Sequence, residues 1–246
     1  SDGLFASAPT FDTIGFFLQD ATGLETVAAL LCNNWQAVMP DARKSKPVLG
    51  VPDGPYLAKA TPEGRAAFES QVAGLNQAGY EVRRVEALSD IEEIVQRNKL
   101  IHSAEMAQFH ADWFARYEVR YRPRTAQLIR DGQGVKTGDL IAARAECQQL
   151  RQKIEAEMTG NGIDLWISPS TPGPAPEGIT TTGDPIMNLP WTQAGLPAVN
   201  IPAGYAQNGL PLGLQLVGTF RGDEQLVAWV PPIADIFSGS YSRALI

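Results

Sequence analysis

The sequence IDLWISPSTPGPAP, at residues 163–176, carries the strongest structural signal in this chain. It opens with an apolar run over residues 163–168, which is typical of a buried β-strand. Four prolines then fall within residues 169–176. Because proline lacks an N–H donor and fixes φ, these residues can form neither a helix nor a central strand. The stretch therefore predicts a buried strand that leads into a stiff, extended loop.

Further strands are expected on both sides of this stretch. Residues 198–204 and 211–218 read as two strands, and the Asn-Gly pair between them favours a hairpin turn with positive φ. Upstream, residues 46–51 and 80–85 read as strands. Between these two, Thr61 precedes a proline and is expected to cap a helix that runs to about Gln77. This upstream order is typical of a βαβ unit.

Four other segments show the helical spacing of apolar residues. The expected helices cover residues 22–39, 89–117, 136–158 and 223–229. The apolar phase of the second helix slips near residues 101–105, which fits either two helices or one bent helix. The third is expected to stop at Gly160-Asn161-Gly162. The last is expected to be capped by Asp223 and broken by Pro231-Pro232.

The composition is that of a folded protein that does not bind nucleic acid. The 246 residues are 44% hydrophobic and 19% charged, enough for a substantial core. The formal net charge is -7, and the basic residues are scattered, so no basic stripe faces phosphates. No apolar run reaches the roughly 18 residues of a membrane span. The basic residues concentrate only at Arg116, Arg120, Arg122, Arg124 and Arg130. We interpret this cluster as a solvated helix face, with an anion or partner site as the alternative.

The cysteines and histidines do not predict a metal or redox centre. Cys32 and Cys147 lie 115 residues apart without a metal-ligand spacing, and both are expected to be small buried side chains. This usage and the lack of a visible export signal favour a cytoplasmic location. His102 and His110 are eight residues apart on a predicted helix, over 10 Å along its axis, too far to share a metal. We expect no metal and no cofactor, because the sequence also lacks phosphate-binding glycine loops.

A set of motifs in the last third resembles the amidase signature family. It comprises GDPIMNLPWTQAGLP at 183–197, NIPAG at 200–204 and GLPLGLQLVG at 209–218. APTFDTIGFF at 8–17 and DLWISPSTP at 164–172 match earlier landmarks of that family in the same order. The resemblance implies an α/β fold with a mixed β-sheet flanked by helices. It also implies that residues 1–246 are the C-terminal portion of a single, incomplete amidase domain.

The catalytic groups of that family have no counterpart in this chain. The family uses a serine nucleophile, a second serine on a cis peptide bond and a lysine, with both serines in a Gly/Ser-rich run. No such run is present, and all six lysines follow the landmark at Phe11-Asp12, whereas the family's lysine precedes it. No catalytic residue can therefore be assigned. Because the chain starts without Met at Ser1, we expect it to begin inside a longer protein or to need another chain that supplies the catalytic half.

The resemblance implies that this chain forms a wall of the substrate pocket. A few polar groups on an apolar wall would suit a small-molecule amide. The candidate substrate-binding residues are Ser170, Thr171, Met187, Asn188, Trp191 and Thr192. For each of them, packing or capping is the alternative role. Exposed apolar faces and unpaired strand edges are expected wherever the missing half would sit.

The leading hypothesis is the C-terminal part of an amidase that cleaves a carboxamide to a carboxylate and ammonia or an amine. One alternative is a protein like the amidase-type component of a tRNA-dependent amidotransferase. Another is a non-catalytic binding or scaffold protein derived from an amidase. A truncation product would give the same sequence. The catalytic hypothesis predicts that the isolated chain does not hydrolyse simple amides.

Overall fold

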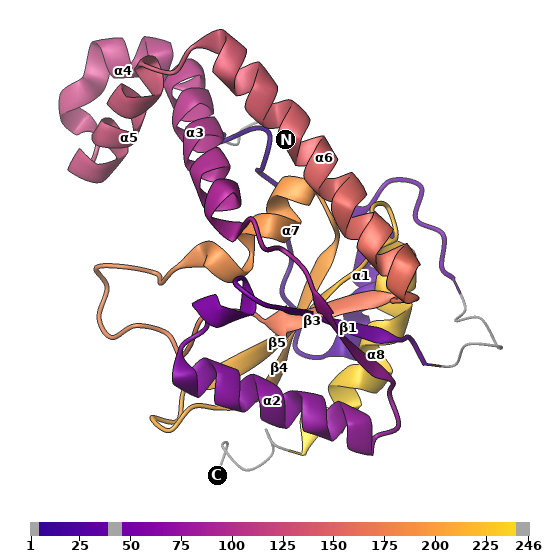
Figure 1. Ribbon diagram of the computed structural model, residues 1–246. Helices are drawn as coiled ribbons and strands as arrows, with labels where there is room; N and C mark the ends of the chain where they lie inside the picture. Colours follow the sequence, from indigo (N-terminus) through magenta and orange to yellow (C-terminus); the bar gives the residue numbers. More distant parts are fainter. Residues whose placement is uncertain (1–4, 39–45, 240–246) are drawn as a thin grey trace.

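The computed structural model describes residues 5–38 and 46–239, which form one five-stranded sheet with helices on both sides (Figure 1). The strand order is β2-β1-β3-β5-β4. β1 pairs in parallel with β2 and β3, whereas β5 is antiparallel to β3 and β4. The strands are β1 (Leu49–Asp53), β2 (Val82–Glu86), β3 (Leu165–Pro169), β4 (Ala198–Tyr205) and β5 (Pro211–Val217). The mixed sheet and the α/β class are therefore confirmed.

The helices divide into a layer on the sheet and an arm that leaves it. α2 lies below the sheet in Figure 1, α8 packs against β4 and β5, and α7 lies above. The end of α3, with α4 and α5, projects to the upper left. The α-helices are α1 (Leu24–Leu31), α2 (Pro62–Gln77), α3 (Ile91–Phe109), α4 (Ala111–Tyr117), α5 (Pro123–Gln133), α6 (Thr137–Asn161), α7 (Leu189–Ala194) and α8 (Asp223–Ser238). Short 3-10 helices are η1 (Ala21–Gly23), η2 (Leu57–Lys59), η3 (Glu118–Arg120) and η4 (Pro185–Met187).

The start of α2 shows how local sequence anchors the proline-rich loop. Thr61 caps the helix as predicted, and its hydroxyl accepts from the Gly64 N–H at 3.1 Å. The Thr61 N–H also donates to the Pro172 carbonyl at 2.8 Å. A Cβ at position 64 would collide with that same carbonyl. Glycine is therefore required where the loop crosses the helix, and the loop is held at its first turn.

Two other predicted chain reversals are confirmed by backbone conformation. Asn208-Gly209 joins β4 and β5, and Gly209 has φ +79°. α6 ends at Gly162, which adopts the left-handed conformation with φ +59°. The predicted strands at 46–51 and 80–85 are each shifted by about two residues in the structure.

The prediction that Pro231-Pro232 breaks the last helix is wrong. α8 continues through both prolines to Ser238, and its N-cap is Gly222 instead of Asp223. A proline inside a helix costs about 3 kcal/mol. The same helix buries Trp229, Val230, Ile233 and Phe237 in the main core, and burial of each large apolar side chain contributes roughly 1.5–3 kcal/mol. Tertiary packing therefore outweighs the local penalty.

The first helix is much shorter than residues 22–39. α1 ends at Leu31, and Asn34 has φ +61°, which no helix continues. Only Ala28 of this helix is buried, so little apolar packing favours a longer one. Cys32 is exposed, which corrects the expectation of two buried thiols, whereas Cys147 is buried as expected. The last residue of the predicted helix, Met39, lies outside the described residues.

The segment 89–117 forms two helices, but the break is at His110 and not near residues 101–105. Ile101, Ala104 and Glu105 are all buried, and packing keeps α3 continuous there. α5 follows, and no helix was predicted for it. Two small apolar clusters stabilise the arm, separate from the main core that surrounds the sheet. Within residues 5–38 and 46–239, no helix combines the length and apolarity that a membrane crossing requires.

Candidate functional site

The predicted pocket residues lie where β3 ends, around a buried hydrogen-bond network. At its centre is the Tyr56 hydroxyl, which lies 2.7 Å from the Met187 carbonyl oxygen, 3.0 Å from Ser168 Oγ and 3.0 Å from Trp191 Nε1. The rings of Tyr56 and Trp191 meet edge to face at 5.7 Å. The network joins the turn after β1, strand β3, η4 and α7.

The donors and acceptors of this network can be assigned. A tyrosine hydroxyl has one proton, and the Met187 carbonyl can only accept, so Tyr56 donates to Met187. Trp191 Nε1–H can only donate, and the Ser168 hydroxyl is then left to donate its proton to the Tyr56 oxygen. Burial raises the pKa of Tyr56 above its usual value, against a smaller lowering by the hydrogen bonds from Ser168 and Trp191. Tyr56 is therefore a neutral structural centre at physiological pH.

A second polar layer follows directly after β3 and lies nearer to solvent. The Ser170 hydroxyl donates to Asn200 Oδ1, and Asn188 Nδ2 donates to the Ser170 carbonyl at 3.2 Å. A Cβ at position 213 would collide with both Ser170 Oγ and Asn200 Oδ1. Gly213 therefore leaves the space in which the Ser170 and Asn200 side chains meet.

The structure brings four predicted residues into these two layers. Met187 and Trp191 belong to the buried network, with Trp191 only 2% exposed. Ser170 and Asn188 are half-buried in the outer layer. Thr171 and Thr192 are exposed on either side. The Thr171 hydroxyl donates to the Gly173 carbonyl at 2.7 Å, which stiffens the loop.

The outer layer contains no activated nucleophile. Within the part of the chain that the structure describes, the Ser170 hydroxyl is bonded to an amide oxygen, not to an imidazole, amine or carboxylate. A serine needs an adjacent base to attack an amide. The same part of the chain contains no group of three or more His, Cys, Asp or Glu side chains placed to hold a metal ion. The arrangement can orient a polar ligand through hydroxyl and amide groups.

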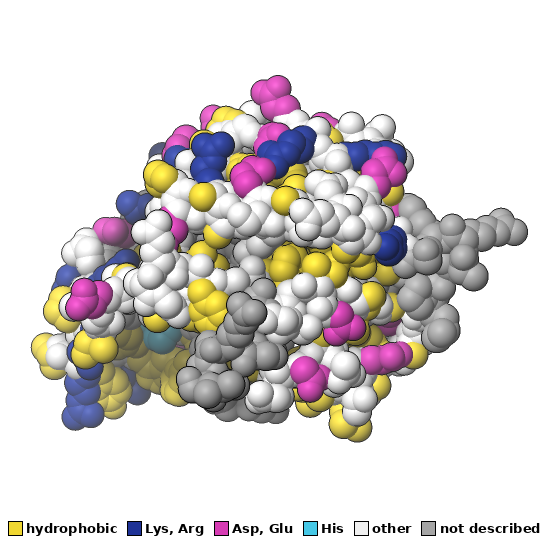
Figure 2. All heavy atoms as spheres, turned by 90° about the horizontal axis from the view of Figure 1, so that it is seen from below, with side chains coloured by type: hydrophobic (Ala, Val, Ile, Leu, Met, Phe, Trp, Pro, Cys, Tyr) yellow, Lys and Arg dark blue, Asp and Glu magenta, His cyan; other side chains and the backbone are white. Residues whose placement is uncertain are grey.

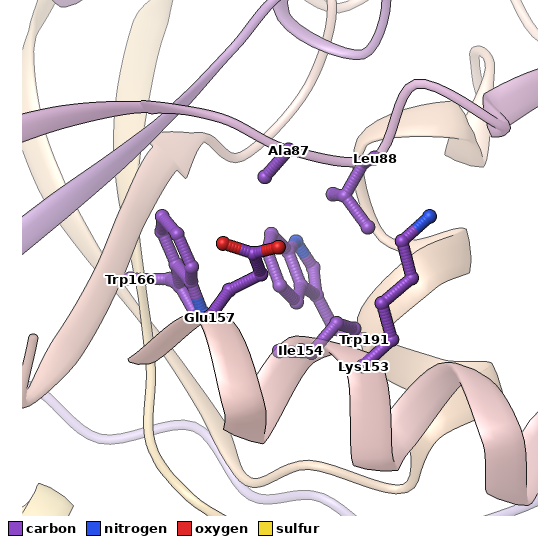
Figure 3. A pocket seen from close by; sticks show the side chains of 7 residues that line it. All are labelled: Ala87, Leu88, Lys153, Ile154, Glu157, Trp166 and Trp191. Atoms are coloured by element: carbon purple, nitrogen blue, oxygen red, sulfur yellow. The ribbon is translucent and has the colours of Figure 1, made fainter. Parts of the chain in front are cut away.

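A cavity behind Trp191 is too small for a substrate. It offers about 10 Å³ to the centre of a water molecule, space for roughly one water. Lys153, Ile154 and Glu157 rise from α6 toward it, and Trp166 forms the opposite wall (Figure 3). The Trp166 Nε1–H has no hydrogen-bond partner. This space belongs to the packing between α6 and the sheet.

A wider, open groove of about 550 Å³ separates α3 from α6, but it contains none of the predicted residues. Its rim carries Glu92, Glu93, Asp139 and Glu146. Arg97 lies in the groove and pairs with Glu146 at 2.8 Å. Carboxylates on two neighbouring helices are a common solvated surface, so this groove does not compete with the layer at Ser170.

Sequence reasoning missed the residues that organise the site. Tyr56 stands in an irregular turn, where no periodicity marks it as buried. Asn200 and Gly213 were quoted only as parts of motifs. Helix α7 was not predicted, although Pro190 near its start and Gly195 after its end, with φ +65°, were usable signals. Gln193 on this helix donates to the Ile94 carbonyl at 2.6 Å and so ties α7 to α3.

Comparison with known proteins agrees with this architecture. A protein-family model described as Amidase matches residues 1–227. A solved structure described as an amidase superposes with a TM-score of 0.75 at 22% identity, covering 88% of this chain and 51% of that chain. At this identity the superposition shows a shared fold.

The curated relatives are longer than this chain. The A-type component of glutamyl-tRNA(Gln) amidotransferase from Novosphingobium aromaticivorans is 28% identical over 235 residues, which are 83% of this chain and 46% of the relative. The protein of the same name from Bartonella tribocorum is 26% identical over 205 residues, 69% of this chain and 40% of the relative. The chain thus spans less than half the length of these two relatives. With the family model matched over residues 1–227, this chain belongs to the amidase family.

Proposed function

We propose that this chain forms one wall of the substrate pocket of an enzyme that hydrolyses a carboxamide C–N bond, with the reacting groups supplied by residues outside it. The observation that carries the proposal is the rigid polar layer at Ser170 and Asn188, built on an amidase fold without an activated nucleophile. The chain also lacks the Gly/Ser-rich run that would supply the family's catalytic serines. In this proposal, residues 1–246 are the C-terminal portion of a single amidase domain.

The six candidate residues then have two roles. Ser170, Thr171, Asn188 and Thr192 offer hydroxyl and amide groups to a bound carboxamide. Met187 and Trp191 hold this surface from behind through Tyr56. Because the donors in the outer layer are fixed by neighbours, little conformational entropy is lost when a ligand binds.

The reaction itself uses the complementary half. A serine hydroxyl, activated through a second serine and a lysine, attacks the amide carbon, and the C–N bond breaks as the nitrogen takes up a proton. Water then releases the carboxylate from the acyl-serine. The wall formed by this chain keeps the carbonyl carbon in reach of that serine.

The names of the relatives favour a second candidate, the A-type component of an amidotransferase that works with partner proteins. In that case the same surface would hold the amide donor. Both candidates fit a cytoplasmic protein, and the two free cysteines support that location. Copurification separates the candidates, since stable partner proteins are expected only for the second.

The test is ammonia release from simple primary amides by the chain alone and by the chain coexpressed with the half of a related amidase that it does not span. We expect no turnover alone and turnover for the pair. In the pair, Asn188→Ala should lower kcat/KM about tenfold, as expected for one lost hydrogen bond to a ligand. Asn76→Ala, on the exposed side of α2, is the matched control and should leave kcat/KM unchanged.

Two outcomes would contradict the proposal. Turnover by the isolated chain that disappears after a single serine substitution would place the nucleophile within it. A pair that assembles and binds amides without hydrolysing them would favour the non-catalytic scaffold.

A further inference from the structure

The far end of the helical arm exposes large apolar side chains that the proposed pocket does not use. Val119 is 97% exposed, Tyr117 47% and Trp113 40%. Phe5 is also exposed, and its ring lies 4.9 Å from that of Trp113. Monomeric proteins rarely expose such clusters unless the surface binds something.

These side chains share one side of α4. Trp113 and Tyr117 are four residues apart, and Arg116 lies between them at helical spacing, so the three occupy one face. Phe114 points the other way and is buried against the base of the arm. The guanidinium of Arg120 stacks 5.6 Å from the ring centre of Tyr117 and so joins the same surface.

The tip is strongly basic within an acidic chain. Residues 116–124 read RYEVRYRPR, with four arginines and one glutamate, a net charge of +3, whereas the whole chain carries -7. Glu118 is paired with Arg130 of α5. Among the residues that the structure describes, no carboxylate pairs with Arg116, Arg122 or Arg124. At the left of Figure 2, where α4 and α5 lie, hydrophobic and Lys or Arg side chains alternate on the surface.

We propose that this arm tip, defined as Trp113, Arg116, Tyr117, Val119 and Arg120 with the neighbouring Arg122 and Arg124, binds the surface of an anionic phospholipid bilayer. Tryptophan and tyrosine favour the headgroup region, where an apolar ring and a polar edge are both solvated suitably. Arginines beside them attract anionic lipids. An exposed valine can enter the acyl boundary. The proposal goes beyond the proposed function and does not depend on it.

Other occupants fit these residues less well. A second copy meeting through the same surface would bring two +3 patches together, which costs free energy. Nucleic acid would contact the arginines but leave the fully exposed Val119 without an apolar partner.

The arm tip also lies apart from the acidic surface and from the sheet. α3 carries Glu92 and Glu93 at its first turn, about 24 Å along the helix from Phe109. That is roughly three Debye lengths at physiological salt, so these carboxylates do not cancel the attraction of the tip. Figure 1 places α4 and α5 away from the β4 edge, where a complementary half could extend the sheet.

The test is sedimentation with phosphatidylcholine vesicles that contain about one third phosphatidylserine, compared with phosphatidylcholine alone. We expect binding to the anionic vesicles that falls as salt rises. The double variant Arg116→Gln/Arg120→Gln should lower the partition coefficient about 25-fold, or fivefold for each arginine near the surface. Arg65→Gln/Arg221→Gln removes the same charge from exposed positions elsewhere and should change it less than about twofold.

Depth is measured with lipids brominated in the acyl chains, which quench tryptophan in the bilayer. Trp113→Phe should retain binding but lose most of the quenching, because Trp166, Trp191 and Trp229 are buried. Equal loss of binding in the two double variants, or RNA binding without vesicle binding, would overturn the proposal. So would loss of vesicle binding when a complementary half is bound, because the tip would then be part of an internal interface.

Discussion

Trp191 and Trp113 belong to two regions of this molecule that combine aromatic and polar residues in opposite ways. In the pocket wall, Trp191 is buried, donates to Tyr56 and packs on Trp166. In the arm tip, Trp113 contacts only other surface rings on an exposed helix face. The wall positions groups within the molecule, whereas the tip leaves its groups available to another surface. Similar residues therefore serve positioning in one region and contact in the other.

The largest expected difference comes from truncating these two tryptophans. Trp191→Ala removes a buried ring and a hydrogen bond and should destabilise the chain by about 3–5 kcal/mol. Trp113→Ala should cost about 1 kcal/mol or less, because the ring is only partly covered. Urea unfolding followed by circular dichroism measures both values. Similar losses for the two variants would contradict the contrast between wall and tip.

Removing one hydroxyl from each region is a finer comparison. Tyr56→Phe leaves Trp191 Nε1–H, the Ser168 hydroxyl and the Met187 carbonyl without their buried partner, so we expect a loss of about 1–3 kcal/mol. Tyr117→Phe should have almost no effect on unfolding. A stable Tyr56→Phe variant would show that the network rearranges without cost.

The pH dependence of unfolding checks the same network. Burial raises the pKa of Tyr56 in the folded chain, so above pH about 10 the unfolded chain releases this proton first. The stability contributed by Tyr56 is complete below that pH and declines above it. Tyr56→Phe should therefore lose less stability than the wild type between neutral and strongly alkaline pH, and an identical decline would contradict the assignment of a neutral hydroxyl.

The base of the arm should resemble the wall more than the tip. The Glu105 side chain is 1% exposed, pairs with Arg144 at 2.6 Å and accepts from the Thr10 N–H at 2.8 Å. Glu105→Gln should cost about 1–2 kcal/mol, since hydrogen bonds to a buried charge are lost. Glu118→Gln breaks an exposed pair at the tip and should cost less than about 0.5 kcal/mol. Equal costs would mean that the arm is uniform along its length.

The smallest effect is a labelling rate at the two cysteines. Cys32 is exposed, whereas burial raises the pKa of the Cys147 thiol between α3 and α6. At mildly alkaline pH a thiol reagent should modify Cys32 quickly and Cys147 only on unfolding. The substitution Cys32→Ser should remove the fast phase, and two equally fast phases in the wild type would contradict the packing of α6.

The strands, most helices and the proline-rich loop could be predicted because their signals are local. Thr61 before Pro62, Asn208-Gly209 and Gly162 each act through backbone geometry, which a short sequence determines. The continuation of α8 through two prolines and the short α1 could not be predicted, since both depend on how much apolar surface the tertiary fold buries.

The candidate site was only partly visible in the sequence. Ser170 and Asn188 could be named from motifs, but their fixed orientation depends on Asn200, which follows thirty residues later on another strand. His102 and His110 were expected to be ordinary helix residues. In the structure they hold the N-terminal segment, with His102 Nε2 2.7 Å from Ser7 Oγ and His110 Nε2 3.2 Å from the Ala6 carbonyl. Such long-range contacts leave no trace in sequence spacing.

The most direct test of the central claim is ammonia release from primary amides by purified chain, measured with and without a complementary amidase half. We predict no release above the buffer rate from the chain alone and sustained release from the assembled pair, dependent on a serine of the added half. Sustained release from the chain alone would contradict the claim that it forms a pocket wall without the reacting groups.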